Sequence, residues 1–174
     1  EIEIGQTVHI GYYDQESRAL NEEQRVIDYI KEVAEYVTTV DGNQITASQM
    51  LEKFLFPPAA QYSFIGNLSG GERRRLYLLR ILMSEPNVLL LDEPTNHIDV
   101  EAVEWLENFL QTYEKAYIII SHDRYFLDKT TKKIIEIDQG KAISYTGNYS
   151  EFLVEREFRR EQQRREFENQ QAYI

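Results

Sequence analysis

The chain has 174 residues, of which 42% are hydrophobic and 28% are charged, and its formal net charge at pH 7 is −11. This length allows one proper hydrophobic core, so we expect one soluble globular domain with an appendage. The acidic balance excludes a surface made throughout for nucleic acid, because phosphate binding requires clustered Lys and Arg. No apolar stretch approaches the roughly 20 residues that cross a bilayer, so we expect no membrane insertion. The lack of cysteine excludes disulfides and fits a reducing cytoplasm, where we place the protein.

The N-terminal residues predict short strands. Residues 2–4 and 8–10 alternate, or nearly alternate, apolar and polar side chains on either side of Gly5. This pattern predicts a hairpin or two edge strands that lead to Gln15.

A helical lobe is predicted next, over residues of about 18–86. From about Asn21 to Val37 the apolar residues recur at helical spacing, and a turn sequence follows at residues 41–43. A second helix is expected from about Ala47 to Phe54, because Pro57 and Pro58 stop it. The lobe would be inserted between strands of a sheet.

A third helix begins near Ser69 and continues to about Met83. Ser69 and Glu72 form a capping box, and Gly70 and Gly71 allow the first turn to approach another surface closely. The positive N-terminal end of such a helix suits an anion. The alternative is a plain capped helix without a ligand.

An apolar run from Val88 to Leu91 predicts a strand buried on both faces of a parallel sheet. The run ends in two carboxylates, Asp92 and Glu93. Ligands of open α/β sheets bind at the carboxyl edge, so Asp92 is placed to hold Mg²⁺ and Glu93 to act on a water beside a phosphate. The alternative is an ordinary strand followed by a turn.

A second polar group follows the next predicted strand. After a helix from about Val100 to Tyr113, residues 117–120 repeat the buried-strand pattern and end at Ser121 and His122. His122 therefore reaches the same sheet edge as Glu93. A single histidine after a strand is more often a structural residue, which stays the alternative.

The C-terminal part predicts a closing strand pair and a charged helix. Residues 133–137 and 142–145 form the strands, with a turn at Gln139 and Gly140. The helix from Glu151 onward is either a surface for RNA phosphates or a solvated helix of alternating charge. Its arginines are Arg156, Arg159, Arg160, Arg164 and Arg165.

Taken together, these motifs resemble the second half of an ABC-type ATPase domain over about residues 8–148. Gln15 resembles the Q-loop glutamine, residues 68–72 the signature, residues 88–93 the Walker B strand, residues 96–99 the D-loop and His122 the switch histidine. The amino-acid sequence of residues 93–99 and 121–124 is most similar to that of ABC-F proteins. ABC-F proteins are soluble, carry two ATPase domains in tandem and act on ribosomes as translation factors or antibiotic-resistance factors.

The resemblance implies a parallel-sheet α/β fold, with a partial ABC ATPase domain over residues 1–150 and a helical linker segment over residues 151–174. In that family the linker reaches toward tRNA and the ribosome. The implied ligands are ATP and Mg²⁺, and the implied partner is a second ABC domain. The implied catalytic residues are Glu93 and His122, the metal-binding residues are Asp92 and Gln15, and the nucleotide-binding residues are Gln15, Ser69, Gly70, Gly71, Glu72 and Asp99.

One motif of the family is missing from the sequence. No Gly-x-x-x-x-Gly-Lys-[Ser/Thr] occurs, and the nearest stretch, residues 66–71, continues as Glu72-Arg73. Without that loop the backbone cradle for the β- and γ-phosphates is lacking. We therefore expect the chain to be a fragment of a longer ATPase and to be inactive alone, with a degenerate domain as the alternative.

Three other functions stay open. A DNA-repair or chromosome-maintenance ATPase shares these motifs, but the segment between Gln15 and Ser69 is too short for the long coiled coils of that class. An ATPase subunit of a membrane transporter is disfavoured by residues 96–99 and by the tail. A non-catalytic interaction domain is favoured if the whole gene also lacks the phosphate-binding loop.

Overall fold

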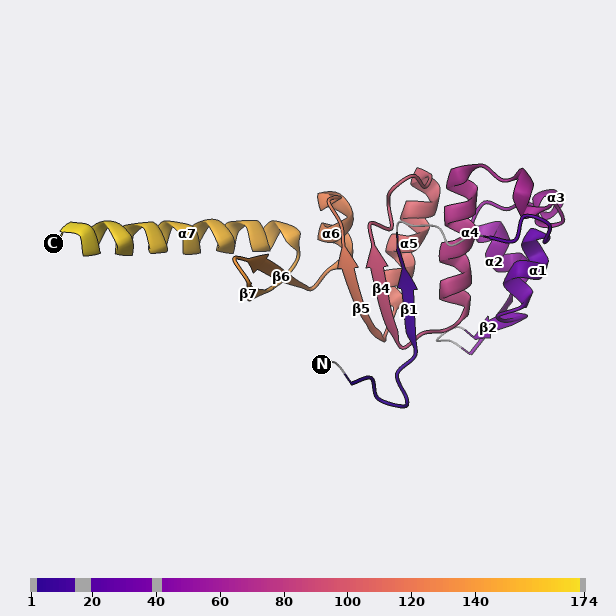
Figure 1. The fold of residues 1–174 in the computed structure, drawn as a ribbon, viewed down its shortest axis with the longest axis horizontal. Coiled ribbons are helices and arrows are strands. Elements are labelled where there is room, and N and C mark those ends of the chain that lie inside the picture. The colour runs from indigo at the N-terminus through magenta and orange to yellow at the C-terminus, as the bar shows by residue number, and fades with distance from the viewer. Residues whose placement is uncertain (1–2, 15–19, 39–41, 173–174) are drawn as a thin grey trace. The chain divides into compact units, whose positions relative to one another are not determined.

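The computed structural model describes residues 3–14, 20–38 and 42–172 and shows an α/β protein (Figure 1). Two compact units divide it, Glu1–His122 and Asp123–Ile174. In the first unit the elements are β1 (Ile10–Tyr13), α1 (Val26–Lys31), β2 (Tyr36–Thr38), β3 (Gln44–Thr46), α2 (Ala47–Lys53), α3 (Pro58–Gln61), the short 3-10 helix η1 (Ile65–Asn67), α4 (Gly70–Met83), β4 (Val88–Asp92), α5 (Val100–Thr112) and β5 (Ala116–Ile120).

The central sheet has the strand order β1-β4-β5, and all of its strands are parallel. Its register aligns Tyr13 with Leu91 and Asp92 with Ile120, so the carboxyl ends of the strands meet at one edge. Parallel pairing follows from the connections, because the chain crosses over through helices between successive strands. The parallel-sheet α/β fold predicted from the sequence is confirmed.

The prediction that the Val88 strand is buried on both faces is wrong. In β4, Leu89 and Leu91 are buried, whereas Val88 and Leu90 are only half-buried. Helix α4 lies on the buried face, where the Tyr77 ring packs against Tyr13 of β1 at 5.9 Å. Among the described residues, helices therefore cover one face of this sheet more completely than the other.

The predicted N-terminal hairpin is also wrong, because residues 3–9 form no strand. Asn87 holds this segment at the entrance of β4 instead. Its side-chain oxygen accepts the backbone N–H of His9 at 2.8 Å, and its amide donates to the Thr7 carbonyl at 2.7 Å. These contacts start the parallel pairing of β1 with β4, which lies far along the chain.

The helix predicted from Asn21 to Val37 is much shorter in the structure. Only α1 is helical, and Val26 and Ile30 on it are fully buried. Tyr36–Thr38 instead pairs as β2 with β3, antiparallel. Residue 41 of the predicted turn lies outside the described residues. The second predicted helix is confirmed as α2, whose N-cap Thr46 forms a capping box with Gln49.

The second unit contains α6 (Arg124–Thr130), β6 (Lys133–Asp138), β7 (Lys141–Thr146) and α7 (Tyr149–Ala172). The predicted turn is confirmed, because Gln139 and Gly140 both have positive φ, at 46° and 76°. A two-residue turn of this kind matches the twist of the β6–β7 hairpin.

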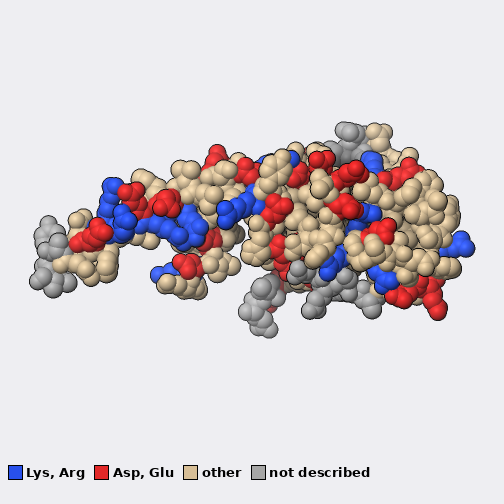
Figure 2. Space-filling view, turned by 90° about the horizontal axis from the view of Figure 1, so that it is seen from above, with Lys and Arg blue, Asp and Glu red and all other residues tan. Residues whose placement is uncertain are grey.

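The charged helix predicted from Glu151 onward is confirmed as α7. Its basic side chains gather along one stretch of the helix, with carboxylates among them (Figure 2). Each of its five arginines lies within 4 Å of a glutamate carboxylate. No helix in the described part of the chain has the length and apolar character needed to span a membrane.

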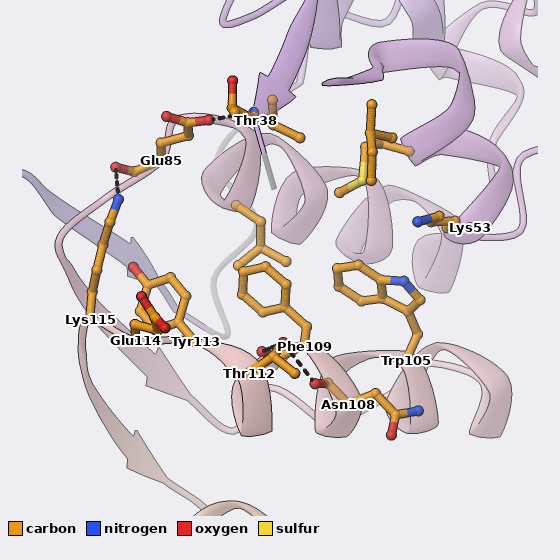
Figure 3. Close-up of a pocket in the computed structure, with 14 residues that line it drawn as sticks. Thr38, Lys53, Glu85, Trp105, Asn108, Phe109, Thr112, Tyr113, Glu114 and Lys115 are labelled. Atoms are coloured by element: carbon orange, nitrogen blue, oxygen red, sulfur yellow. Dashed lines mark hydrogen bonds between the residues drawn. The ribbon is translucent and has the colours of Figure 1, made fainter. Parts of the chain in front are cut away.

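A cavity of about 530 Å³ lies in the first unit beside α5 (Figure 3). Trp105 and Phe109 of α5, with Tyr113 directly after the helix, line it on one side. Residues of β2, β3, α2 and the end of α4 line the other side. The cavity therefore lies between the helical lobe and a helix of the sheet layer, and it is open to solvent.

Candidate functional site

Glu93 is the first residue after β4 and has a left-handed backbone, with φ of 48°. Its N–H donates to the Ile120 carbonyl at 2.8 Å, which fixes the turn to the end of β5. Its side chain is only 11% exposed and accepts the backbone N–H of His122 at 3.3 Å and the Ser121 hydroxyl at 3.4 Å. The carboxyl ends of β4 and β5 therefore hold one nearly buried carboxylate in place.

His122 lies beside this carboxylate. Its Nε2 is 3.5 Å from Oε1 of Glu93, while its side chain is 99% exposed. The backbone of His122 is held by Glu93, but the imidazole faces solvent. The sequence prediction that Glu93 and His122 reach one sheet edge is thus met by direct contact.

Two further carboxylates end neighbouring strands at this edge. Asp92 is the last residue of β4, and Asp14 leaves β1 at the same level, because Tyr13 pairs with Leu91. Oδ1 of Asp14 is buried and has no hydrogen-bond partner among the described residues. An unpaired buried carboxylate oxygen is costly unless a cation or a donor satisfies it. Sequence reasoning missed Asp14, although it follows a strand as Asp92 does.

These carboxylates fit Mg²⁺ in one specific way. No cluster of three or more His, Asp or Glu side chains within the described ranges can hold a metal by itself. Mg²⁺ bound with a nucleotide needs only one or two protein carboxylates, because phosphate oxygens and waters fill the other positions. Asp92 and Asp14 suit that role. Gln15, the other predicted metal-binding residue, lies outside the described residues.

The signature segment begins α4 as the sequence predicts. The Glu72 N–H donates to Oγ of Ser69 at 3.3 Å, and Oε2 of Glu72 accepts the Ser69 N–H at 2.8 Å and its hydroxyl at 2.7 Å. The hydrogen bonds from Ser69 lower the pKa of the Glu72 carboxyl, so it stays ionised. A phosphate arriving at Ser69 would have to compete with this carboxylate for the hydroxyl.

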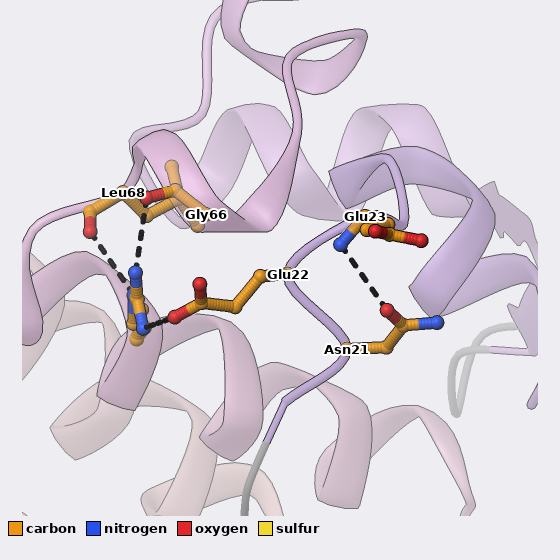
Figure 4. A network of polar contacts seen from close by, with 6 residues as sticks. Asn21, Glu22, Glu23, Gly66 and Leu68 are labelled. Carbon is orange, nitrogen blue, oxygen red and sulfur yellow. Dashed lines mark hydrogen bonds and ion pairs between the residues drawn. The ribbon is translucent and has the colours of Figure 1, made fainter.

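Arg73 fastens the loop that precedes α4. Its guanidinium pairs with Glu22 at 2.7 Å and donates to the carbonyls of Leu68 at 3.1 Å and Gly66 at 3.0 Å (Figure 4). The signature loop is therefore held by a charged side chain rather than by its own backbone alone. Sequence reasoning did not identify this anchor.

The signature helix and the D-loop are in close contact. A Cβ on Gly71 would lie 2.9 Å from the His97 carbonyl, whereas one on Gly70 would meet nothing within 4 Å. The predicted close approach is therefore confirmed at Gly71 only. Arg75 of α4 also forms an ion pair with Asp99, the N-cap residue of α5.

Arg75 is buried although it carries a charge. Its side chain is 5% exposed, its guanidinium lies over the Phe56 ring at 5.0 Å, and its Nε has no hydrogen-bond partner among the described residues. Desolvation lowers the pKa of Arg75, against the opposing field of Glu72. Sequence reasoning missed Arg75, although an arginine within the apolar stripe that continues at Leu76 and Leu79 was the available signal.

The predicted site residues thus fall into two groups. Asp92, Glu93 and His122 gather at the carboxyl edge of the sheet. The signature segment at residues 69–72 and Asp99 are joined through Arg75 and Gly71.

Comparison with known proteins matches residues 4–96 and 135–174 to two protein-family profiles, both described as ABC transporter. The chain is 53% identical to the ABC transporter ATP-binding protein YfmR of Bacillus subtilis over 156 residues, which cover 89% of this chain and 25% of that protein. It is 50% identical over 105 residues to the energy-dependent translational throttle protein EttA of Mycobacterium tuberculosis, covering 60% of this chain and 18% of that protein.

Solved structures show the same fold at low identity. An ATP-binding subunit of an ABC transporter has a TM-score of 0.63 and 18% identity, covering 79% of this chain and 59% of that one. An archaeal ribosome recycling factor, solved with a ribosomal stalk protein, has a TM-score of 0.65 and 21% identity, covering 89% of this chain and 31% of that one.

The chain spans a quarter or less of the length of YfmR and EttA. The order of its motifs, its parallel sheet and its identity to these proteins agree with one another. The chain belongs to the ATP-binding cassette family and, within it, to the ABC-F proteins.

Proposed function

We propose that this chain supplies the acidic edge and the signature helix of ATP-hydrolysing sites in a longer ABC-F protein that acts in translation. The observation that carries the proposal is the pairing of Glu93 with His122 at the carboxyl edge of the sheet, beside Asp92. A nearly buried carboxylate next to an exposed imidazole can act on water and on a phosphate at the same place.

Glu93 would orient or deprotonate the attacking water. Its turn is fixed by the Ile120 carbonyl, and its Oε2 is held by the His122 N–H, so the carboxylate is pre-positioned. The exposed His122 imidazole would contact the γ-phosphate. Asp92, with Asp14 beside it, would hold Mg²⁺, which neutralises charge on the phosphates when it is bound.

The signature segment would serve a second ABC domain. Ser69 and the amides of Gly70 and Gly71 lie at the start of α4, where the helix dipole and bare N–H groups attract anions. They would hold the γ-phosphate of ATP that the facing domain binds with its own phosphate loop. The ion pair between Arg75 and Asp99 joins this segment to the D-loop, so both would move together.

A role on the ribosome in the cytoplasm rests on the relatives and on α7. One relative is named a translational throttle protein, and one structural neighbour is a ribosome recycling factor. Helix α7 carries five arginines on an extended surface, which suits contacts with rRNA or tRNA. A role in antibiotic resistance is the other ABC-F activity that this proposal allows.

The test is Glu93→Gln in the intact protein. The amide keeps the shape of the carboxylate but cannot accept a proton, so Mg-ATP binding should persist while hydrolysis slows by about two or more orders of magnitude. Glu104→Gln, on the exposed side of α5, is the matched control and should leave turnover unchanged. Normal turnover by Glu93→Gln would remove Glu93 from the mechanism.

A further inference from the structure

The cavity beside α5 is lined by none of the residues that are predicted to bind or hydrolyse the nucleotide. Its rim includes Glu85, which precedes β4, and Lys115, which precedes β5. In a parallel sheet these positions lie at the amino ends of the strands, opposite the edge that carries Asp92 and Glu93. A ligand in this cavity would therefore not occupy the ATP site.

The floor of the cavity is a fixed row of aromatic rings. Trp105, Phe109 and the C-cap residue Tyr113 follow one another at intervals of one helical turn along α5, with ring centroids 5.2 and 5.3 Å apart. Phe54, which is 1% exposed, packs against Trp105 at 4.3 Å, and the Tyr113 hydroxyl donates to the Pro86 carbonyl. Both ends of the row are held, so the surface exists before any ligand arrives.

The opposite wall is aliphatic. Val37 and Ile45 come from the β2–β3 hairpin, Met50 from α2 and Leu82 from α4. Figure 3 shows the Trp105 and Phe109 rings projecting away from the α5 ribbon, on the side where Lys53 and Thr38 lie. A flat apolar group can therefore lie against the rings with hydrocarbon on its other side.

Charge is distributed unequally along the rim. At the Tyr113 end, Glu85 accepts the Thr38 N–H at 3.1 Å, and Lys115 reaches the Glu85 carbonyl at 3.4 Å. At the Trp105 end, Lys53 forms no ion pair within the described part of the chain, and it lies at the same end of the cavity as the indole (Figure 3). The cavity thus offers an ammonium group beside its largest ring, at the end away from Lys115 and Glu85.

We propose that this cavity binds a small planar aromatic acid, with its ring on Trp105 and Phe109 and its anionic group at Lys53. A volume of about 530 Å³ with mainly apolar walls and few polar groups is typical of small-molecule sites. Ring stacking supplies affinity, and the Lys53 ammonium supplies the preference for an anion.

Trp105 is the only tryptophan of the chain, so its indole N–H gives one resolved signal in a ¹H–¹⁵N spectrum of the 174-residue protein. Naphthalene-2-carboxylate is the probe. We expect a saturable shift of the indole signal with a dissociation constant below about 1 mM. Neutral 2-naphthalenemethanol should bind about threefold more weakly, since a partly exposed charge contact is worth no more than that. Cyclohexanecarboxylate, which lacks the planar ring, should give no saturable shift.

Lys53→Met tests the charge and keeps the aliphatic stem. This variant should bind the carboxylate and the alcohol equally, whereas Lys31→Met, an exposed α1 lysine outside the cavity, should retain the threefold preference. Phe109→Leu should weaken both aromatic ligands. The proposal is overturned if the indole signal does not respond saturably to the carboxylate, or if Lys53→Met keeps the preference while its other amide signals stay native.

Discussion

Arg75, buried in the signature helix α4, reaches Asp99 at the N-cap of α5 and joins it in an ion pair. The Arg75 side chain is 5% exposed and that of Asp99 is 62% exposed, so one partner is desolvated and the other is hydrated. Such a pair does little for stability in itself, but it fixes where the D-loop ends relative to the signature. We therefore expect the signature helix and the D-loop to move together.

Arg75→Met should change the free energy of unfolding by no more than about 1 kcal/mol, because the Asp99 carboxylate left behind is largely hydrated, but it should loosen the first turn of α5. Hydrogen exchange at residues 103–106, the first amides of α5 with helical hydrogen bonds, reports the loosening. A double-mutant cycle with Asp99→Asn separates the pair from other effects of Arg75. If the two changes are additive, the ion pair has no energetic role.

Gly71→Ala should cost about 1–3 kcal/mol, because its Cβ would lie 2.9 Å from the His97 carbonyl and the D-loop must shift. Gly70→Ala is the matched control, since it meets open space in the same helical turn and should be neutral or slightly stabilising. Thermal unfolding of both variants measures the difference. Equal midpoints would show that the loop accommodates the methyl group freely.

The raised pKa of Tyr13 predicts that the folded protein loses stability at alkaline pH. Burial raises the pKa of Tyr13 to about 12, against the opposing field of Arg74, while the unfolded chain titrates near its ordinary value of 10. Between these values the unfolded state has lost the proton and the folded state keeps it. The free energy of unfolding therefore falls from pH 10 to pH 12, by about 2–3 kcal/mol for this residue.

Urea unfolding at pH 8 and pH 11 measures this loss. Tyr13→Phe cannot ionise, so its stability should fall less over the same interval. Burial also raises the pKa values of Tyr29, Tyr113, Tyr117 and Tyr145, so a smaller decline should persist in the variant. An identical decline in both proteins would show that Tyr13 ionises freely in the folded state.

The effect of replacing an arginine of α7 should depend on whether its glutamate partner lies on α7 or on the β6–β7 hairpin. Arg164 and Arg165 are 70% and 69% exposed and pair only with Glu168 and Glu161 on the same helix, which contributes little to folding. Replacing both with glutamine should weaken ribosome association of the intact protein at low salt while leaving thermal stability unchanged.

Arg156 is the contrasting position for this test. Its Nε lies 2.7 Å from Glu136 of β6, whose side chain is 17% exposed, so Arg156→Gln should loosen α7 from the hairpin. Co-sedimentation across a salt series, with circular dichroism of each variant, distinguishes the two effects. Unchanged co-sedimentation of the Arg164/Arg165 variant would identify α7 as a solvated helix that pairs its own charges.

Local patterns predicted the elements whose causes are local. The capping box at Ser69, the turn at Gln139 and the strands that end at Asp92 and Ile120 all follow from neighbouring residues. The helix predicted to Val37 failed because its apolar residues fit helical spacing, whereas pairing of β2 with β3 decided the structure. Strand pairing depends on the partner strand across a turn, and the helical spacing of apolar residues within one segment gives no information about that partner.

The candidate site divides in the same way. Glu93 and His122 could be predicted because strands in a parallel sheet end at a common edge. The apolar stripe around Arg75 could signal a buried arginine, but its pairing with Asp99 could not be predicted, because only the packing of α4 against the next loop creates that contact. The aromatic row on α5 is periodic, but its use as a cavity floor depends on the distant β2–β3 hairpin.

The left-handed backbone of Glu93 costs stability at the position where we propose that the intact protein acts on water. A left-handed conformation costs a residue with a Cβ about 1 kcal/mol, and glycine avoids that cost. His97, four positions later, also has a left-handed backbone, with φ of 61°, and the same conformational cost. A selection for thermal tolerance alone should therefore accept glycine at position 93 and discard the carboxylate, whereas selection for ATP turnover should keep glutamate and tolerate the strain. If one mutant library is put through both selections, the residue frequencies at position 93 should diverge before those at other positions.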